Sequence, residues 1–331
     1  MGTWLAHPLH PERYHGHGRR PPFFEGWYFK LIDRSEQRRY AIIPGIFLSD
    51  DPAQRHAFVQ VLDGISGHAT YHRYPPDEFW AAADAFDLRI GPNRFTLPEI
   101  SLQIDGPGRT VHGVVQTAGL TPWPITLAAP GIMGWYAWVP FMECYHGVLS
   151  LDHALQGTLT VDGSAVDLTD GRGYIEKDWG PSFPSAWVWF QSNHFQQPGT
   201  SITASIAVIP WLGSAFRGQI IGLWHERVLY RFATYTGARV EKLVIGEQAV
   251  DWVVRDRRHR IEMRARRAQA GLLKGPSKSD MGVRVPETLQ AEVAVRLTAL
   301  EKGAERLVFA GTGRNGGLEV GGDIPRLLRM G

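Results

Sequence analysis

Short runs of β-branched and aromatic residues recur along almost the whole chain, and turn-forming residues separate them. Alternation is clearest in residues 260–266, where apolar side chains take every second position and charged ones the others. A period of two predicts an extended strand with one apolar face. Similar runs occupy residues 24–32, 39–47, 57–62, 155–161, 186–195, 201–209 and 292–300. No amphipathic segment of ordinary helix length lies between them, so the pattern predicts an all-β protein with antiparallel strands.

The number of these runs bears on domain organisation. About twenty strands exceed what one small sandwich or barrel holds, so we expect two closed or nearly closed antiparallel units. The seam is expected in the Gly- and Asp-rich stretch 162–173. This gives an N-terminal β-barrel with an extended N-terminal arm in residues 1–168 and a C-terminal β-barrel in residues 169–331. Residues 271–282 are expected to form a mobile loop.

Composition is that of an ordinary globular protein. Of the 331 residues, 44% are hydrophobic and 21% are charged, which excludes a disordered chain and a coiled coil. Lys and Arg number 35 against 33 Asp and Glu, so we expect no nucleic-acid partner. The single cysteine, Cys144, allows no disulfide within the chain, and the N-terminus has no apolar run typical of a secretion signal. We therefore expect a cytoplasmic protein, and the oligomeric state stays open.

One long stretch, residues 110–142, contains no Asp, Glu, Lys or Arg. It is long enough to cross a bilayer, but Pro122, Pro124, Pro130 and Pro140 would break a helix there. We interpret it as buried strands and loops beside an apolar site. Shallow contact with a membrane surface is the alternative, and it would place the protein at the periphery of a membrane.

Several motifs that would indicate a cofactor are incomplete. Residues 311–316 match G-x-G-x-x-G, but no helix follows to bind a pyrophosphate. His225 and Glu226 begin a zinc-protease motif in which Leu229 replaces the second histidine. The histidines at positions 7, 10, 15 and 17 lie among Gly and Pro, and we interpret them as part of a flexible, partly docked N-terminal arm. The sequence therefore predicts neither a cofactor nor a metal.

Three segments place carboxylates and histidines directly among Trp, Tyr and Phe. They are FFEGWYFK (23–30), PFMECYHG (140–147) and GYIEKDWG (173–180), and the last runs on to residue 194. A carboxylic acid with aromatic walls is desolvated, so its pKa rises and it can stay protonated near neutral pH. Such an acid can protonate an electron-rich alkene, and ring faces would stabilise the resulting carbocation. The three segments together predict a functional pocket.

Spacing indicates which of these side chains share a face of a strand. Alternate residues point the same way, so Tyr174, Glu176 and Asp178 should lie together. The same rule groups the alternate positions of the following run: Trp187, Trp189, Gln191 and Asn193. The alternative is purely structural, with the carboxylates tying strand ends together and Lys177 pairing with Glu176 or Asp178.

The three blocks resemble the tocopherol cyclase family, which is related to the carotenoid hydratases and to lipocalin-like pericyclases. The resemblance runs from about residue 11 to residue 195. It implies two tandem lipocalin-like antiparallel β-barrels and a reaction on a prenylated substrate without a cofactor. In cyclases of this family a proton adds to the first double bond of a prenyl tail, and a phenol oxygen traps the tertiary cation to give a chromanol. The related hydratases trap the cation with water.

The resemblance also implies residue roles. The hydratases have Tyr-x-Asp where this chain has Tyr174-x-Glu176, so Glu176 is the expected proton donor and Tyr174 orients it or relays the proton. His146 is the expected base or partner of the phenol. Cyclases of the family have Asn in place of Asp178, and this second carboxylate would either raise the pKa of Glu176 or be the acid itself. The expected substrate-binding residues are Glu25, Trp27, Tyr28, Glu143, Trp179, Trp187, Trp189, Gln191, Asn193 and His194.

The expected activity is therefore that of a cofactor-independent isoprenoid cyclase, an isomerase or intramolecular lyase that acts on a prenylated quinol or another isoprenoid. Three alternatives stay open: a hydratase, a pericyclase that folds a polyene into a reactive conformer, and a carrier that binds a lipophilic molecule without chemistry. A carrier does not need carboxylic acids among its aromatic residues, so the sequence favours a catalyst.

Overall fold

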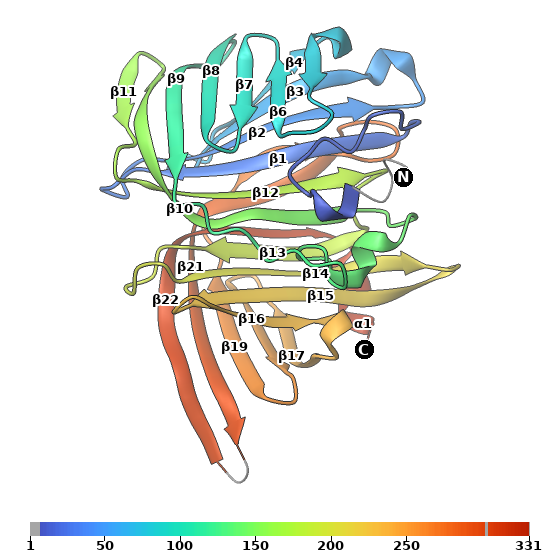
Figure 1. The fold of residues 1–331 in the computed structure, drawn as a ribbon, viewed down its shortest axis with the longest axis vertical. Coiled ribbons are helices and arrows are strands. Elements are labelled where there is room, and N and C mark those ends of the chain that lie inside the picture. The colour runs from blue at the N-terminus through green and yellow to red at the C-terminus, as the bar shows by residue number, and fades with distance from the viewer. Residues whose placement is uncertain (1–6, 302–303, 331) are drawn as a thin grey trace. The chain divides into compact units, whose positions relative to one another are not determined.

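The structure is a computed structural model that describes residues 7–301 and 304–330. Its elements are almost all strands, arranged in two large antiparallel sheets (Figure 1). This confirms the predicted all-β, lipocalin-like fold. Among the described residues, no helix is long and apolar enough to cross a membrane. Residues 1–6, which belong to the N-terminal stretch examined for a secretion signal, lie outside the described residues.

The first sheet is built from strands of the N-terminal half. They are β1 (Phe23–Ile32), β2 (Arg39–Leu48), β3 (His56–Asp63), β4 (Ala69–Tyr74), β5 (Phe79–Ala81), β6 (Asp87–Ile90), β7 (Asn93–Thr96), β8 (Glu99–Gly106), β9 (Arg109–Ala118), β10 (Tyr145–Val161), β11 (Ser164–Asp167) and β12 (Arg172–Gly180). Their order is β4-β3-β2-β1-β12-β10-β9-β8-β7-β6-β5, and β11 pairs with β10. The 3₁₀ turns of this half are η2 (His7–Leu9), η3 (Pro52–Gln54), η4 (Pro76–Glu78) and η5 (Gly134–Trp138).

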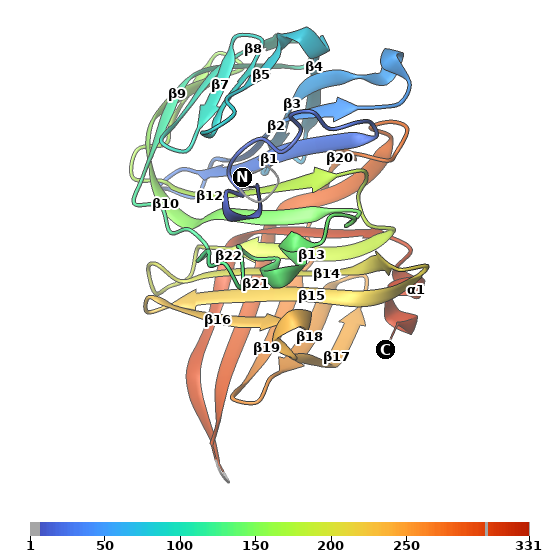
Figure 2. The same ribbon diagram turned by 45° about the vertical axis from the view of Figure 1, so that its right-hand side comes forward.

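The core of the first sheet lies on its concave face. On β1, the alternate residues Trp27 and Phe29 point to this face, where Trp27 stacks on Phe86 with ring centroids 5.5 Å apart. Phe29 meets Phe95 of β7 at 5.8 Å, although β1 and β7 lie far apart in the strand order. The sheet therefore curls so that distant strands face each other across a filled interior (Figure 2).

The second sheet is built from the C-terminal half. Its strands are β13 (Ala186–Ser192), β14 (Ser201–Trp211), β15 (Ser214–His225), β16 (Val228–Ala233), β17 (Arg239–Ile245), β18 (Ala249–Arg255), β19 (His259–Arg266), β20 (Gly271–Gly275), β21 (Val283–Glu301) and β22 (Ala304–Gly322), with β20 paired to β21. This half also contains the 3₁₀ turn η6 (Thr234–Thr236) and the helix α1 (Ile324–Arg329). The strand order is β16-β15-β14-β13-β22-β21-β19-β18-β17. Val188 and Phe190 point into its core, where Phe190 meets Trp252 edge-on with centroids 6.1 Å apart.

The chain divides into two compact units at a different place from the expected boundary. One unit contains residues up to Phe183 together with Gly271–Arg284, and the other contains Pro184–Ala270 and the residues from Val285 onward. The expected boundary after residue 168 would assign β12 to the second unit. In the structure β12 lies between β1 and β10 of the first sheet and pairs with both strands along most of its length.

The segment Gly271–Arg284, part of which was expected to be a mobile loop, is a structured part of the first unit. It contains strand β20 (Gly271–Gly275). The Gln60 side chain accepts from the Lys274 amide at 2.8 Å and donates to the Lys274 carbonyl at 2.9 Å. Met281 packs with Phe24 in a cluster on the convex face of the first sheet. The Gly- and Ser-rich composition suggested mobility, but these long-range contacts fix the segment.

His56 on β3 makes the stability of the first unit depend on pH. Burial, opposed by a hydrogen bond to the Gln54 carbonyl, lowers the pKa of His56 to about 4. The neutral ring donates from Nδ1 to that carbonyl at 2.5 Å and accepts at Nε2 from the Tyr71 hydroxyl at 2.5 Å. Protonation of the ring would remove the acceptor from the Tyr71 hydroxyl.

We expect acidification to destabilise the protein through His56. Because the pKa is lower in the folded chain, the unfolded chain takes up the proton first, and stability falls as the pH drops from about 6.5 toward 4. His56 should account for a loss of about 2 kcal/mol between about pH 6.5 and pH 5. Urea unfolding of the wild type and of His56→Phe at both pH values measures this change in the free energy of unfolding. Equal pH dependence in the two proteins would contradict a neutral His56.

Candidate active site

Strand β12 runs between β1 and β10, and the three aromatic and acidic segments singled out in the sequence meet there. The register places Tyr28 of β1 and Val148 of β10 on either side of Glu176. It places Gly26 and His146 on either side of Asp178. Because side chains alternate along a strand, the predicted residues divide between two opposite faces of these three strands.

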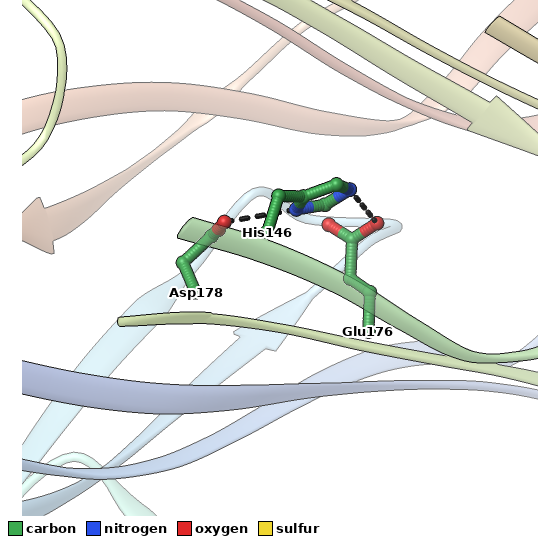
Figure 3. A group of neighbouring side chains, drawn as sticks. All are labelled: His146, Glu176 and Asp178. Carbon is green, nitrogen blue, oxygen red and sulfur yellow. Dashed lines mark hydrogen bonds and ion pairs between the residues drawn. The ribbon is translucent and has the colours of Figure 1, made fainter. Parts of the chain in front are cut away.

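The convex face carries a cluster formed by His146, Glu176 and Asp178 (Figure 3). Nδ1 of His146 lies 2.8 Å from Oδ1 of Asp178, and Nε2 lies 3.6 Å from Oε2 of Glu176. The Tyr174 hydroxyl donates a hydrogen bond to the same Oε2. Glu176 is only 5% exposed. The structure thus brings together the four residues expected to be catalytic, while their roles in catalysis stay predictions.

The charge of His146 follows from its two carboxylate neighbours. Burial favours the neutral ring, but the nearby charges of Asp178 and Glu176 and the hydrogen bond to Asp178 outweigh burial and raise the pKa of His146 to about 9. The ring is therefore an imidazolium at neutral pH. Nδ1–H donates to Asp178, and Nε2–H points toward Glu176.

The opposite, concave face carries a second cluster built around the ion pair of Glu25 and Lys177. Both side chains are fully buried. Lys177 lies 4.7 Å from the ring centroids of Trp27 and Trp179, and its Nζ donates to the carbonyl of Arg13. The pairing of Lys177 with Glu176 or Asp178, weighed as the structural alternative, is therefore wrong, because Lys177 points to the other face.

This ionic cluster also fixes the N-terminal arm. The His15 amide donates to both carboxylate oxygens of Glu25, at 2.8 and 3.1 Å, and its ring stacks on Trp179 with centroids 4.4 Å apart. Burial opposes ionisation of Glu25, but Lys177 and His15 outweigh it and hold the pKa of this carboxyl below its usual value. Glu25, Trp27 and Trp179 thus lie on the face opposite Glu176, and their role in substrate binding stays a prediction.

The other predicted binding residues lie in three places. Tyr28 is on the convex face beside Glu176. Glu143, in the loop before β10, accepts a hydrogen bond from the Ser182 hydroxyl at 3.1 Å. The remaining residues belong to the second unit: Trp187, Trp189, Gln191, Asn193 and His194.

In the second unit, Trp187, Trp189 and Gln191 share the face of β13 that points away from Val188 and Phe190. His194 and Asn193 follow the strand, with Nδ1 of His194 3.1 Å from Oδ1 of Asn193. All five predicted residues are buried.

The sequence interpretation missed two acidic residues near this face, Glu319 and Glu287. Glu319 of β22 lies opposite Trp189, and its Oε2 accepts a hydrogen bond from the indole of Trp187 at 2.7 Å. Glu287 of β21 lies in turn opposite Glu319 and is fully buried. The available signal was weak, since each is a lone carboxylate in an ordinary strand, and only the register brings them beside Trp187.

The cluster on the convex face could also hold a metal ion. One ligand atom from each of His146, Glu176 and Asp178 lies within 4.8 Å of the others, and one nitrogen with two carboxylate oxygens is an ordinary donor set for a divalent cation. Among the described residues, no other such group of three is found. The expectation that no metal takes part therefore stays a prediction with a direct test.

Fold and site together define a class: an all-β, lipocalin-like protein of two units with a buried, hydrogen-bonded carboxyl group on one sheet. The profile of the tocopherol cyclase-like family matches residues 110–322, well over half of the chain. The protein belongs to this family, as its motifs predicted. The matched residues include His146, Glu176 and the β13 face, whereas β1 lies outside them.

Two curated relatives carry the family name. The chain is 25% identical over 279 residues to the probable chloroplastic tocopherol cyclase of Oryza sativa subsp. japonica. It is 24% identical over 277 residues to the chloroplastic tocopherol cyclase of Zea mays. Each alignment covers 68% of this chain and 58% of the relative, so the chain spans little more than half of either length.

Solved structures show the same fold at low sequence identity. CghA, in a structure with Sch210972, superposes with a TM-score of 0.55 at 13% identity, covering 92% of this chain and 89% of CghA. Kievitone hydratase from Nectria haematococca gives a TM-score of 0.50 at 12% identity, covering 94% of this chain and 93% of the hydratase.

Proposed function

We propose that this protein is a cofactor-independent isoprenoid cyclase that converts a prenylated quinol into a chromanol. The observation that carries the proposal is the buried carboxyl of Glu176, whose Oε2 has the Tyr174 hydroxyl and Nε2 of His146 as neighbours. The family and the names of the two plant relatives support the choice of substrate class.

The proposed reaction moves one proton and leaves the composition of the substrate unchanged. Protonated Glu176 gives its proton to the prenyl double bond, and the positive charge develops on the tertiary carbon. The phenol oxygen attacks that carbon, a C–O bond forms, and the phenol proton returns to the Glu176 carboxylate. No electrons are transferred, so the reaction needs no redox cofactor, and Tyr28 beside Glu176 offers a ring to stabilise the cation.

The geometry supports distinct roles for the neighbours of Glu176. The hydrogen bond from the Tyr174 hydroxyl and the His146 ring, whose Nε2 lies 3.6 Å from Oε2, would stabilise the carboxylate left after proton transfer, which leaves Oε1 as the atom that carries the proton. Ionised Glu176 is one of the charges that raise the pKa of His146, so protonation of Glu176 at the start of the reaction leaves Asp178 as the charge that keeps the ring protonated. Asp178 holds His146 in that form and orientation, so we assign Asp178 a positioning role and Glu176 the role of acid.

The first test is to incubate the purified protein with a phytyl-substituted benzoquinol, with and without EDTA. We expect a new chiral isomer of unchanged mass in both samples. Chiral chromatography with mass detection measures this product. Loss of product with EDTA, and its return with a divalent cation, would contradict the metal-free mechanism. A product heavier by one water would make the protein a hydratase. Quinol recovered unchanged would overturn the proposal in favour of a carrier or of a pericyclase with another substrate.

A further inference from the structure

The loop between β9 and β10 presents large apolar side chains to solvent. Leu127 is 74% exposed, Phe141 54%, Trp135 45% and Ile125 40%. The run without any charged residue, residues 110–142, contains all four. Water-facing surfaces normally mix charged side chains with scattered apolar ones, so four large exposed apolar side chains on one loop without charges mark this loop as an interaction surface.

The backbone holds these side chains outward. Thr126 and Ala129 exchange two backbone hydrogen bonds of 3.1 Å, which form a tight turn with Leu127 near its tip. Ile125 and Pro130 form a β-bridge at the base of this turn. The indole of Trp138 donates to the carbonyl of Leu127 at 3.0 Å. The exposure of Leu127 is therefore a property of an ordered turn.

A basic rim lies beside this loop. Arg19 of the N-terminal arm lines a small cavity, of about 30 Å³, together with Trp138 and Pro140 of the loop. Arg19 and the adjacent Arg20 are both exposed. The loop thus combines an uncharged apolar and aromatic tip with the guanidinium of Arg19 beside it, and Arg20 follows Arg19 in the chain.

We propose that residues 119–142 dock this protein on the surface of a lipid bilayer. Burial of Leu and Phe side chains at the boundary between headgroups and acyl chains is favourable in free energy. Trp side chains are favoured at the level of the headgroups, and arginines attract anionic headgroups. A stretch of this length without any charged residue, with an arginine beside it, favours a lipid surface over a protein partner, because protein interfaces carry a polar rim. This inference goes beyond the proposed reaction and does not depend on it.

The test is co-sedimentation of the full chain, without substrate, with vesicles of phosphatidylcholine alone and of equal parts phosphatidylcholine and phosphatidylglycerol. The protein should bind both, and more strongly the anionic ones. The double variant Leu127→Ser/Phe141→Ser should lower the partition coefficient for both by roughly tenfold or more. Replacing Arg19 and Arg20 with Gln should weaken binding to the anionic vesicles only, by severalfold for each arginine.

Val244→Ser is the matched control, because Val244 is an exposed apolar residue on β17, outside this loop. It should bind vesicles like the wild type, and circular dichroism should show every variant folded. Wild type that stays in the supernatant with both vesicles overturns the proposal. Vesicle binding by the double variant that equals binding by the wild type would also overturn the proposal. A third outcome is that the wild type does not bind vesicles but forms a dimer in sedimentation velocity, and that Leu127→Ser/Phe141→Ser abolishes this dimer. That result would assign these side chains to contact with a second copy of the chain.

Discussion

Replacing Glu176 with Gln is expected to lower the turnover of a prenylated quinol by roughly 10³-fold or more, because the amide cannot supply the proton that starts the reaction. The substitution preserves size and keeps an acceptor for the Tyr174 hydroxyl. Binding of the quinol, followed by quenching of tryptophan fluorescence, should therefore change little. Single-turnover rates of isomer formation measure the effect.

Three further variants make this result specific. Tyr174→Phe and Asp178→Asn should each lower turnover less than Glu176→Gln, because they remove support for the acid and not the acid itself. Glu99→Gln, on a partly exposed strand position, is the matched control and should react like the wild type. If Glu176→Gln keeps full turnover and Asp178→Asn is inactive, Asp178 and not Glu176 is the acid.

Replacing Lys177 with Met is expected to lower the free energy of unfolding by about 3–5 kcal/mol, because the buried carboxylate of Glu25 would lose its lysine partner and keep only His15 beside it. Both side chains are fully buried, so water cannot replace the lost partner. Lys177→Met together with Glu25→Gln should recover most of this loss, since the amide keeps an acceptor for the His15 amide without a charge. Urea unfolding measures all three proteins.

The control for this prediction is Arg34→Met, which breaks the exposed ion pair of Arg34 and Asp170. Solvent screens this pair, so its loss should change the unfolding free energy little. If Lys177→Met does not fold, a folded Lys177→Met/Glu25→Gln variant would likewise show that Glu25 and Lys177 depend on each other. A stable single variant, or a double variant as unstable as the single one, would contradict the assignment of Glu25 and Lys177 as a mutually dependent pair.

The amino-acid sequence by itself determined the all-β fold, the family and the grouping of Tyr174, Glu176 and Asp178. These features depend on local rules. The period of two along a strand follows from backbone geometry, so it places alternate side chains together whatever the rest of the chain does. The family motifs are likewise contiguous in sequence.

Only the tertiary structure decided which segments meet. The register between β1, β10 and β12 brings His146 to Asp178 and sends Glu25 and Trp27 to the opposite face. Backbone hydrogen bonds are the same in every register, and a shift by one residue exchanges the two faces, so spacing within one strand cannot predict this division. For the same reason, the return of Gly271–Arg284 to the first unit and the position of Glu319 beside Trp187 depend on contacts between residues far apart in the chain.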